Sequence, residues 1–224
     1  MEEKKFVQFK KDEYAVKEYV KNSLGKGRIS SVKIDYTPVG EKIIVATNKP
    51  GLVIGRRGER INSLTSFLKK RFKLENPHIE IKEIIKAEFD AQLIADEIAL
   101  ALERLGSLKF KIIAYKALQR IKDAGALGVE IRLSGKLPSE RAKRWRFAWG
   151  YLKKTGDTAK IVDKAQSAGK TMAGIVGVKV AILSPDKKIH DQIKIDDNIR
   201  QRIKAIIEIP EENKDKKTKS KEKK

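Results

Sequence analysis

The sequence predicts an α+β protein, and three patterns along the chain support this prediction. Residues 12–24 and 61–72 repeat apolar side chains at the spacing of an amphipathic helix. Residues 29–36 and 42–48 are short runs rich in β-branched residues, separated by a proline–glycine turn signal. From Gly128 onward the apolar period changes to two, which is typical of half-buried strands. Helices and strands are therefore expected in both halves of the chain.

The composition indicates a polyanion as partner. The chain has 224 residues with 51 Lys+Arg against 30 Asp+Glu, a net charge of +21. Nucleic acid is the leading candidate and an anionic membrane surface is second. No apolar run approaches the length of a membrane-spanning helix, and the first residues lack the apolar region of a signal peptide, so we expect a cytoplasmic protein without a membrane partner. The absence of cysteine excludes disulfides, cysteine-based zinc sites and thiol chemistry.

The most informative stretch is a two-glycine turn, Gly55-Arg56-Arg57-Gly58, between a short apolar run and an amphipathic helix. Glycine has no Cβ, so a ligand backbone can approach closely. The free amides at the start of the following helix and the two guanidinium groups would together attract a phosphate. The alternative is an ordinary helix–turn–helix corner with two solvated arginines. The G-x-x-G spacing favours a KH domain, which clamps about four nucleotides of RNA backbone.

The order of elements around this turn supports a KH domain of type II. A helix, two strands, two helices and a third strand opening at Pro77 give the order α-β-β-α-α-β over residues 12–86. A type I domain would run β-α-α-β-β-α instead.

The second half predicts helices packed on a mostly antiparallel sheet. Two helices are expected at residues 88–105 and 108–123. Strands are expected from residue 128, where Glu130 and Arg132 alternate with apolar residues, and at residues 143–153, 158–166 and 174–183. The aromatic residues that alternate along 143–153 fit a core better than a platform for base stacking.

This reading divides the chain into four parts. Residues 1–86 form the first helix with the KH domain, and residues 87–106 a connecting helix. Residues 107–209 form a C-terminal α+β domain, with a short helix near 198–206, and residues 210–224 a disordered lysine-rich tail.

The candidate RNA-binding residues form three cationic groups. For each, the alternative is a solvated surface, but the net charge of the chain favours RNA contact. The helix at 108–123 should bury one apolar stripe and expose a basic face. The stripe is Phe110, Ile113, Ala114, Ala117, Leu118 and Ile121. The three groups are the loop residues Gly55, Arg56, Arg57 and Gly58, the helix residues Lys111, Lys116 and Arg120, and the strand residues Arg141, Lys143, Arg144 and Arg146.

Catalysis is not expected. The two histidines, His78 and His190, stand in polar surroundings, and no nucleophile elbow or nucleotide-hydrolase phosphate loop occurs. The acidic pair Asp196-Asp197 lies in loop-like sequence, where solvated charge is the usual explanation. We expect no cofactor, metal or small-molecule substrate, although a metal-dependent nuclease would need only carboxylates that converge in space.

These stretches together carry a family resemblance. The runs KPGLVIGRRGERINSL, GVEIRLSGKL, ERAKRWRFAWGYLKKTGD and GIVGVKVAIL, in this order, resemble the universal KH-domain ribosomal protein family of the small subunit, third in the usual numbering. The likeness covers about residues 10–185, and the lysine-rich tail is more similar to the archaeal branch.

The resemblance implies a place in the head of the small ribosomal subunit, with ribosomal RNA, messenger RNA and neighbouring head proteins as partners. Basic residues on the first helix of the family's second domain face incoming messenger RNA and help to unwind it. That role would pass here to Lys111, Lys116 and Arg120, but Ile112 stands where the family usually has a second basic residue. The alternative functions are a nucleic-acid repair nuclease and a free KH-type regulator of messages.

Overall fold

The computed structural model describes residues 2–38, 40–72, 74–187, 189 and 199–203. The described residues up to 187 belong to one compact unit, while residue 189 and the helical residues 199–203 belong to a second. The predicted helix near 198–206 therefore has its described part in helical conformation. The predicted disorder of residues 210–224 lies outside the described residues. None of the described helices is long and apolar enough to cross a membrane.

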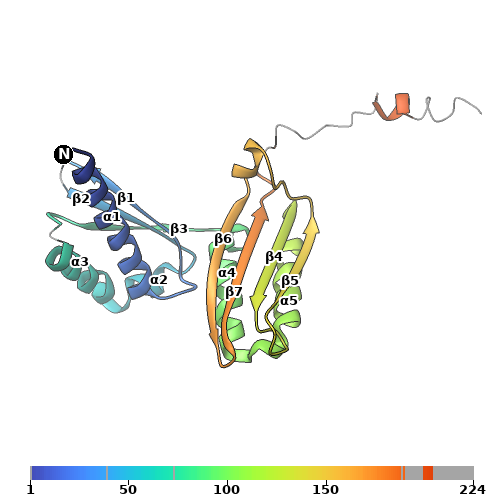
Figure 1. The fold of residues 1–224 in the computed structure, drawn as a ribbon. Coiled ribbons are helices and arrows are strands. Elements are labelled where there is room, and N and C mark those ends of the chain that lie inside the picture. The colour runs from blue at the N-terminus through green and yellow to red at the C-terminus, as the bar shows by residue number, and fades with distance from the viewer. Residues whose placement is uncertain (1, 39, 73, 188, 190–198, 204–224) are drawn as a thin grey trace, which may run out of the picture. The chain divides into compact units, whose positions relative to one another are not determined.

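The first part of the larger unit has the predicted element order. Its strands form a three-stranded sheet in the order β1-β2-β3, in which β1 and β2 are antiparallel and β2 and β3 are parallel (Figure 1). The elements are α1 (Glu2–Leu24), β1 (Ile29–Thr37), β2 (Gly40–Thr47), α2 (Pro50–Ile54), α3 (Glu59–Phe72) and β3 (His78–Glu83). The type II KH order, α-β-β-α-α-β, is thereby confirmed.

The helix α1 is longer than predicted. It begins ten residues earlier than expected, at Glu2, because its first three turns are exposed and carry no apolar stripe for a sequence pattern to detect. Val16, Val20 and Leu24 form the buried stripe, whereas Tyr14 is 67% exposed. These residues pack with those of α2, α3 and the sheet into one hydrophobic core, in which Leu68 of α3 is fully buried.

The second part contains the predicted antiparallel sheet with two helices on one face. The strand order is β5-β4-β7-β6, and each neighbouring pair is antiparallel. In Figure 1, α4 lies behind β6 and β7, and α5 behind β4 and β5. The elements are α4 (Ala91–Leu105), α5 (Phe110–Asp123), β4 (Gly128–Gly135), β5 (Lys143–Gly150), β6 (Asp163–Thr171) and β7 (Gly174–Leu183).

Several boundaries in this part differ from the prediction, including the end of β6 at Thr171 and the start of α5 at Phe110, and three of the differences have a local reason. Helix α4 begins three residues later than predicted because Asp90 caps it, its carboxylate accepting from the backbone N–H groups of Gln92 and Leu93 at 2.9 and 3.1 Å. Strand β5 ends at Gly150, which has a φ of 70°. The third strand begins at Asp163, not at residue 158, because residues 157–160 form a 3₁₀ turn.

The core of the second part joins the helices to the sheet as the stripe on α5 predicts. Phe110, Ile113, Ala114, Ala117 and Ile121 are buried, and Leu118 is half-buried. From the sheet side, Phe147 is buried and Trp145 and Trp149 pack against the same core. The Phe110 and Trp145 rings lie 5.2 Å apart. The aromatic residues of β5 are thus core residues, as expected.

The two hydrophobic cores lie in different stretches of the chain, the first within residues 16–81 and the second within residues 89–182. We propose on this basis to keep the predicted division after residue 86. Helix α4 contributes Ile94, Ile98 and Leu102 to the second core, so it belongs to that packing as well as connecting the two parts.

Truncation of the α5 stripe should destabilise the protein in proportion to burial. Ile121 is fully buried, so Ile121→Ala should lower the free energy of unfolding by about 2 to 5 kcal/mol. Leu118→Ala, at a half-buried position, should cost about half as much. Urea denaturation followed by circular dichroism would measure both. Equal losses would contradict the helix orientation described here.

Candidate nucleic-acid interface

The G-x-x-G turn is a backbone structure that needs its glycines. Gly55 and Gly58 have φ values of 77° and 75°, in the left-handed region that favours glycine. A Cβ on Gly55 would lie 2.9 Å from Cγ of Arg60. The Arg60 guanidinium donates to the backbone oxygen of Leu52 at 2.9 Å, which joins α3 back to α2 across the turn. The Arg60 side chain therefore packs against the first glycine of the turn and also links α3 to α2 by a hydrogen bond.

The two arginines between the glycines point away from the core. Arg56 and Arg57 are both exposed, and together with Gly58 they form a 3₁₀ turn at the start of α3. Arg57 has φ 50° and ψ 25°, a conformation that few residues other than glycine adopt. Two guanidinium groups thus stand beside the positive end of the α3 dipole, which is the arrangement expected to attract a phosphate.

Helix α5 presents its cations in different directions. The Nζ of Lys111 lies 5.0 Å from the centre of the Trp145 ring, on the side of the helix that faces β5. Lys116 is exposed, and Ile112 beside the basic face is 68% exposed. Arg120 is directed toward α4, where its guanidinium binds both carboxylate oxygens of Glu97, one at 2.9 Å. Lys111 and Lys116 are therefore available to a partner, while Arg120 is already paired.

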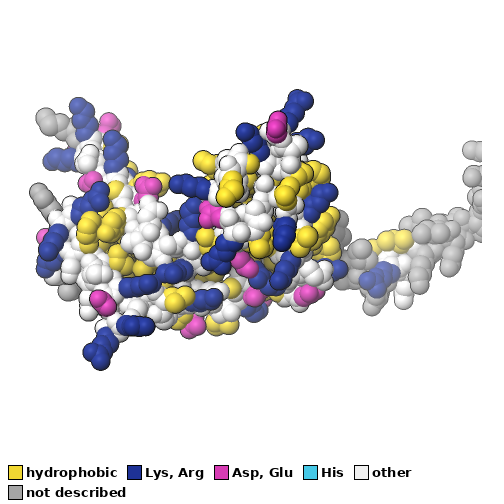
Figure 2. Space-filling view, turned by 90° about the horizontal axis from the view of Figure 1, so that it is seen from below, with side chains coloured by type: hydrophobic (Ala, Val, Ile, Leu, Met, Phe, Trp, Pro, Cys, Tyr) yellow, Lys and Arg dark blue, Asp and Glu magenta, His cyan; other side chains and the backbone are white. Residues whose placement is uncertain are grey.

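The third predicted group does not form a single cluster. Arg141 lies in the loop before β5, and Lys143, Arg144 and Arg146 lie on β5, all of them exposed. Within the part of the chain that the structure describes, Arg146 is the one of these four that makes an ion pair, with Glu130 of β4 at 2.8 Å. Lys and Arg side chains are spread over the face shown in Figure 2, and Asp and Glu side chains on it are fewer.

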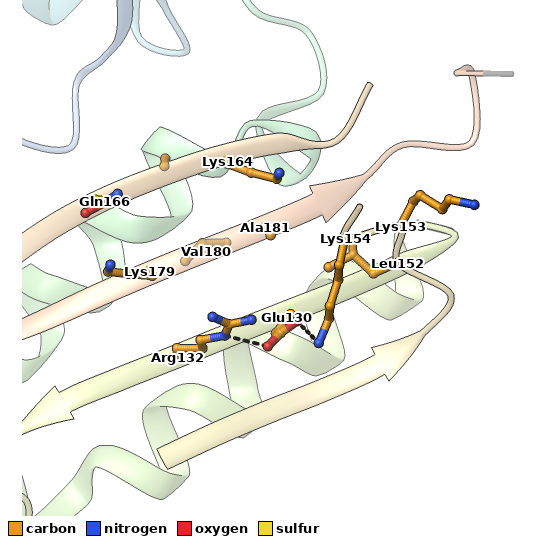
Figure 3. Close-up of a pocket in the computed structure, with 11 residues that line it drawn as sticks. Glu130, Arg132, Leu152, Lys153, Lys154, Lys164, Gln166, Lys179, Val180 and Ala181 are labelled. Atoms are coloured by element: carbon orange, nitrogen blue, oxygen red, sulfur yellow. Dashed lines mark hydrogen bonds and ion pairs between the residues drawn. The ribbon is translucent and has the colours of Figure 1, made fainter. Parts of the chain in front are cut away.

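Glu130 is a residue beside these cations whose burial the sequence analysis did not predict. It is 3% exposed although it stands on the sheet face opposite to the helices. Three cations surround its carboxylate: Arg132 at 2.6 Å, Arg146 at 2.8 Å and Lys154 at 3.1 Å. Figure 3 shows Arg132 and Lys154 reaching it from opposite sides. The alternation of Glu130 with apolar residues placed it on this face, but only the pairing of β4 with β5 brings Arg146 to it.

The positive surroundings outweigh burial in setting the ionisation of Glu130. Burial alone would raise its pKa, but hydrogen bonds from Arg132, Lys154 and Arg146 lower the pKa to about 2, from an ordinary value of 4.5. The carboxylate therefore stays ionised at neutral pH and offsets the repulsion among the cations around it.

The residues considered for catalysis do not assemble in the described structure. His78 is exposed at the start of β3. His190, Asp196 and Asp197 lie outside the described residues. Among the residues that are described, no group of three or more His, Cys, Asp or Glu side chains could hold a metal ion.

Comparison with known proteins identifies both parts of the chain. Residues 15–89 match the family described as KH domain, and residues 98–182 match the family described as ribosomal protein S3, C-terminal domain. The chain is 40% identical over 209 residues to the small ribosomal subunit protein uS3 of Methanocaldococcus jannaschii, which covers 93% of this chain and 99% of the relative. The chain belongs to the uS3 family.

Further uS3 relatives agree. The protein of Archaeoglobus fulgidus is 41% identical over 87% of this chain and 84% of the relative, and that of Methanococcus maripaludis is 36% identical over 94% and 98%. The predicted membership in an archaeal-type KH-domain ribosomal protein family is thus confirmed, and with it the α+β class that starts with a KH domain. Membership makes the chain a protein of the small ribosomal subunit.

The charge cluster at Glu130 should make stability depend on pH in the acidic range. A carboxyl group whose pKa is lower in the folded state stabilises the fold above its unfolded pKa, near 4.5, and loses this effect as the pH falls toward 2. At pH 7, Glu130→Gln should lower the free energy of unfolding by about 1 to 3 kcal/mol. The difference from the parent chain should shrink between pH 4.5 and 2, as measured by urea denaturation.

The control for this experiment is Glu18→Gln, at an exposed position of α1. It removes the same charge from the chain without touching the cluster. If both variants lose the same stability at every pH, net charge would explain the result and the cluster would not.

Proposed function

We propose that this chain is a structural RNA-binding protein of the small-subunit head, which contacts ribosomal RNA through its KH loop and basic surfaces and borders the path by which messenger RNA enters. The observation that carries the proposal is the turn at residues 55–58, where exposed Arg56 and Arg57 stand between two glycines that require left-handed backbone. Such a turn lets a sugar–phosphate backbone approach the helix end closely. Membership in the uS3 family supplies the ribosomal setting.

Helix α5 supports the part of the proposal that concerns messenger RNA. Its buried stripe fixes the helix on the sheet, so Lys111 and Lys116 are held outward on a rigid element. Positive charges held on a rigid surface can bind the phosphates of a strand while base pairs ahead of it open. Arg120 contributes less to this surface because Glu97 already neutralises it.

We also propose the partners and the cellular location of the protein. Its partners are ribosomal RNA, messenger RNA and neighbouring proteins of the head, in the cytoplasm, without a role as an enzyme. The net charge of +21 fits a protein that neutralises phosphates within a ribonucleoprotein.

Reversing the charge of the KH loop should weaken RNA binding without unfolding the domain. Arg56→Asp with Arg57→Asp places negative charge where a phosphate would lie, and aspartate tolerates the left-handed conformation at residue 57 better than most residues. We expect at least about a tenfold loss of affinity for small-subunit ribosomal RNA, measured by filter binding at fixed salt.

The matched control changes the net charge equally at another place. Lys4 and Lys11 stand exposed on α1 and make no ion pair among the described residues, so Lys4→Glu with Lys11→Glu also removes four charges. Equal affinity of the two variants, with unchanged circular dichroism spectra, would show that the loop is no phosphate clamp.

Removing the lysines of α5 should impair translation selectively. Lys111→Ala with Lys116→Ala should change the free energy of unfolding by less than about 1 kcal/mol, since exposed cations and cation–π contacts contribute little to folding. Subunits that contain this variant should translate messages with a stable hairpin poorly and unstructured messages normally. Lys4→Ala with Lys11→Ala is the control, and the same yield from both kinds of message would refute the messenger RNA role.

A further inference from the structure

The face of the four-stranded sheet that α4 and α5 do not cover carries a row of cations, which no sequence motif predicts. Strand pairing places Arg146 of β5 opposite Arg132 of β4, and Arg132 opposite Lys179 of β7. Gln166 of β6 continues the row opposite Lys179. Neighbouring strands lie about 4.8 Å apart, so three positive side chains stand side by side on adjacent strands. Like charges in such positions repel one another, which makes the row costly to keep without a counter-charge.

Next to this row the sheet forms a hollow of about 290 Å³. The neighbouring row of side chains runs Ala148, Glu130, Ala181 and Lys164, so two of its four members are small. Lys154 closes the hollow from the segment that follows β5, and Figure 3 shows the lysine side chains standing around it. Among the residues that line it, Glu130 is the acidic one. The hollow therefore keeps a strong excess of positive charge.

Glu130 holds part of this group in place and leaves another part unpaired. Its carboxylate fixes Arg132, Arg146 and Lys154 by direct hydrogen bonds and ion pairs. Lys164 and Lys179 are exposed on the far side of the hollow and make no ion pair within the described part of the chain. The site thus consists of positioned cations beside two free ammonium groups.

We propose that this sheet face, formed by Arg132, Arg146, Lys154, Lys164 and Lys179 around Glu130, binds the phosphodiester backbone of RNA. The inference rests on the proposed RNA-binding function and adds a second surface to it, distinct from the KH loop and from the lysines of α5. Lys164 and Lys179 make the direct phosphate contacts, and Glu130 positions the neighbouring arginines. The small side chains of Ala148 and Ala181 leave room for a strand to lie across the sheet.

The chemistry of the face favours RNA over an acidic protein segment. Protein interfaces concentrate their affinity in buried aromatic or arginine anchors and are depleted of lysine at the centre. This face has Lys179 on the central strand β7 and Lys164 and Lys154 beside it, and the aromatic residues of β5 point to the opposite side, into the core. Neutral donors such as Gln166 stand beside the cations, which suits phosphate and sugar oxygens.

The test uses the full chain and small-subunit ribosomal RNA. Lys164→Glu with Lys179→Glu changes the net charge by four at exposed positions, and Lys4→Glu with Lys11→Glu is the control with the same change. Affinity is measured by filter binding over a range of KCl concentrations. The face variant should bind roughly tenfold more weakly than the control, and its slope of log K against log salt should be shallower by about 1.4, since each contact with a single strand contributes about 0.7. Thermal melting confirms that both variants are folded.

The outcomes separate this inference from the proposed function. If the face variant and the control bind alike while the variant with Asp at 56 and 57 binds weakly, the KH loop binds RNA and the sheet face does not. If the parent chain binds ribosomal RNA no better than the Arg56 and Arg57 variant does, the loop proposal fails, and a specific loss in the face variant would still support the sheet face. If the face variant keeps RNA affinity but its subunits lack a neighbouring protein, the face docks a protein and the inference is wrong.

Discussion

The packing of two helices on one face of the four-stranded sheet is the constraint that the charged surfaces depend on. An antiparallel sheet can keep one face in water while the other is buried. Here α4 and α5 cover one face with an almost wholly apolar core. This arrangement forces the polar side of α5 outward and leaves the far face of the sheet for charged residues. The same burial thus creates two cationic surfaces that point in different directions.

A dense cationic face is stable only if its repulsion is offset. The neighbouring positions of Arg146, Arg132 and Lys179 would destabilise the sheet if they stood alone. Glu130 lies one row away on β4, where it pairs with Arg132 of the same strand and joins β4 to β5 through Arg146. It offsets part of the charge and not all of it, so the fold tolerates the face while an attraction for anions remains.

The sequence predicted the element order well, because that order depends on local patterns. The turn at 55–58, the alternating strands and the stripe of α5 are each contained in fewer than twenty residues. What failed were features without a local signal. The first three turns of α1 are exposed and lack a buried stripe, so no periodic pattern marks the residue at which the helix begins. The burial of Glu130 needs the register of β4 with β5 and a lysine from residue 154, which no pattern within one strand contains.

The KH loop and the sheet face use different means to place positive charge. On the sheet, cations project from regular strands and a carboxylate holds them by hydrogen bonds. In the loop, the conformation of the backbone sets where the cations lie. Arg57 adopts a left-handed conformation that costs of the order of 1 kcal/mol for a residue other than glycine. The bond from Arg60 to Leu52 and the close approach of Arg60 to Gly55 hold that conformation in place. Arg56 and Arg57 make no ion pair with the residues that the structure describes, so the proposed phosphate contact would not have to displace an acidic partner.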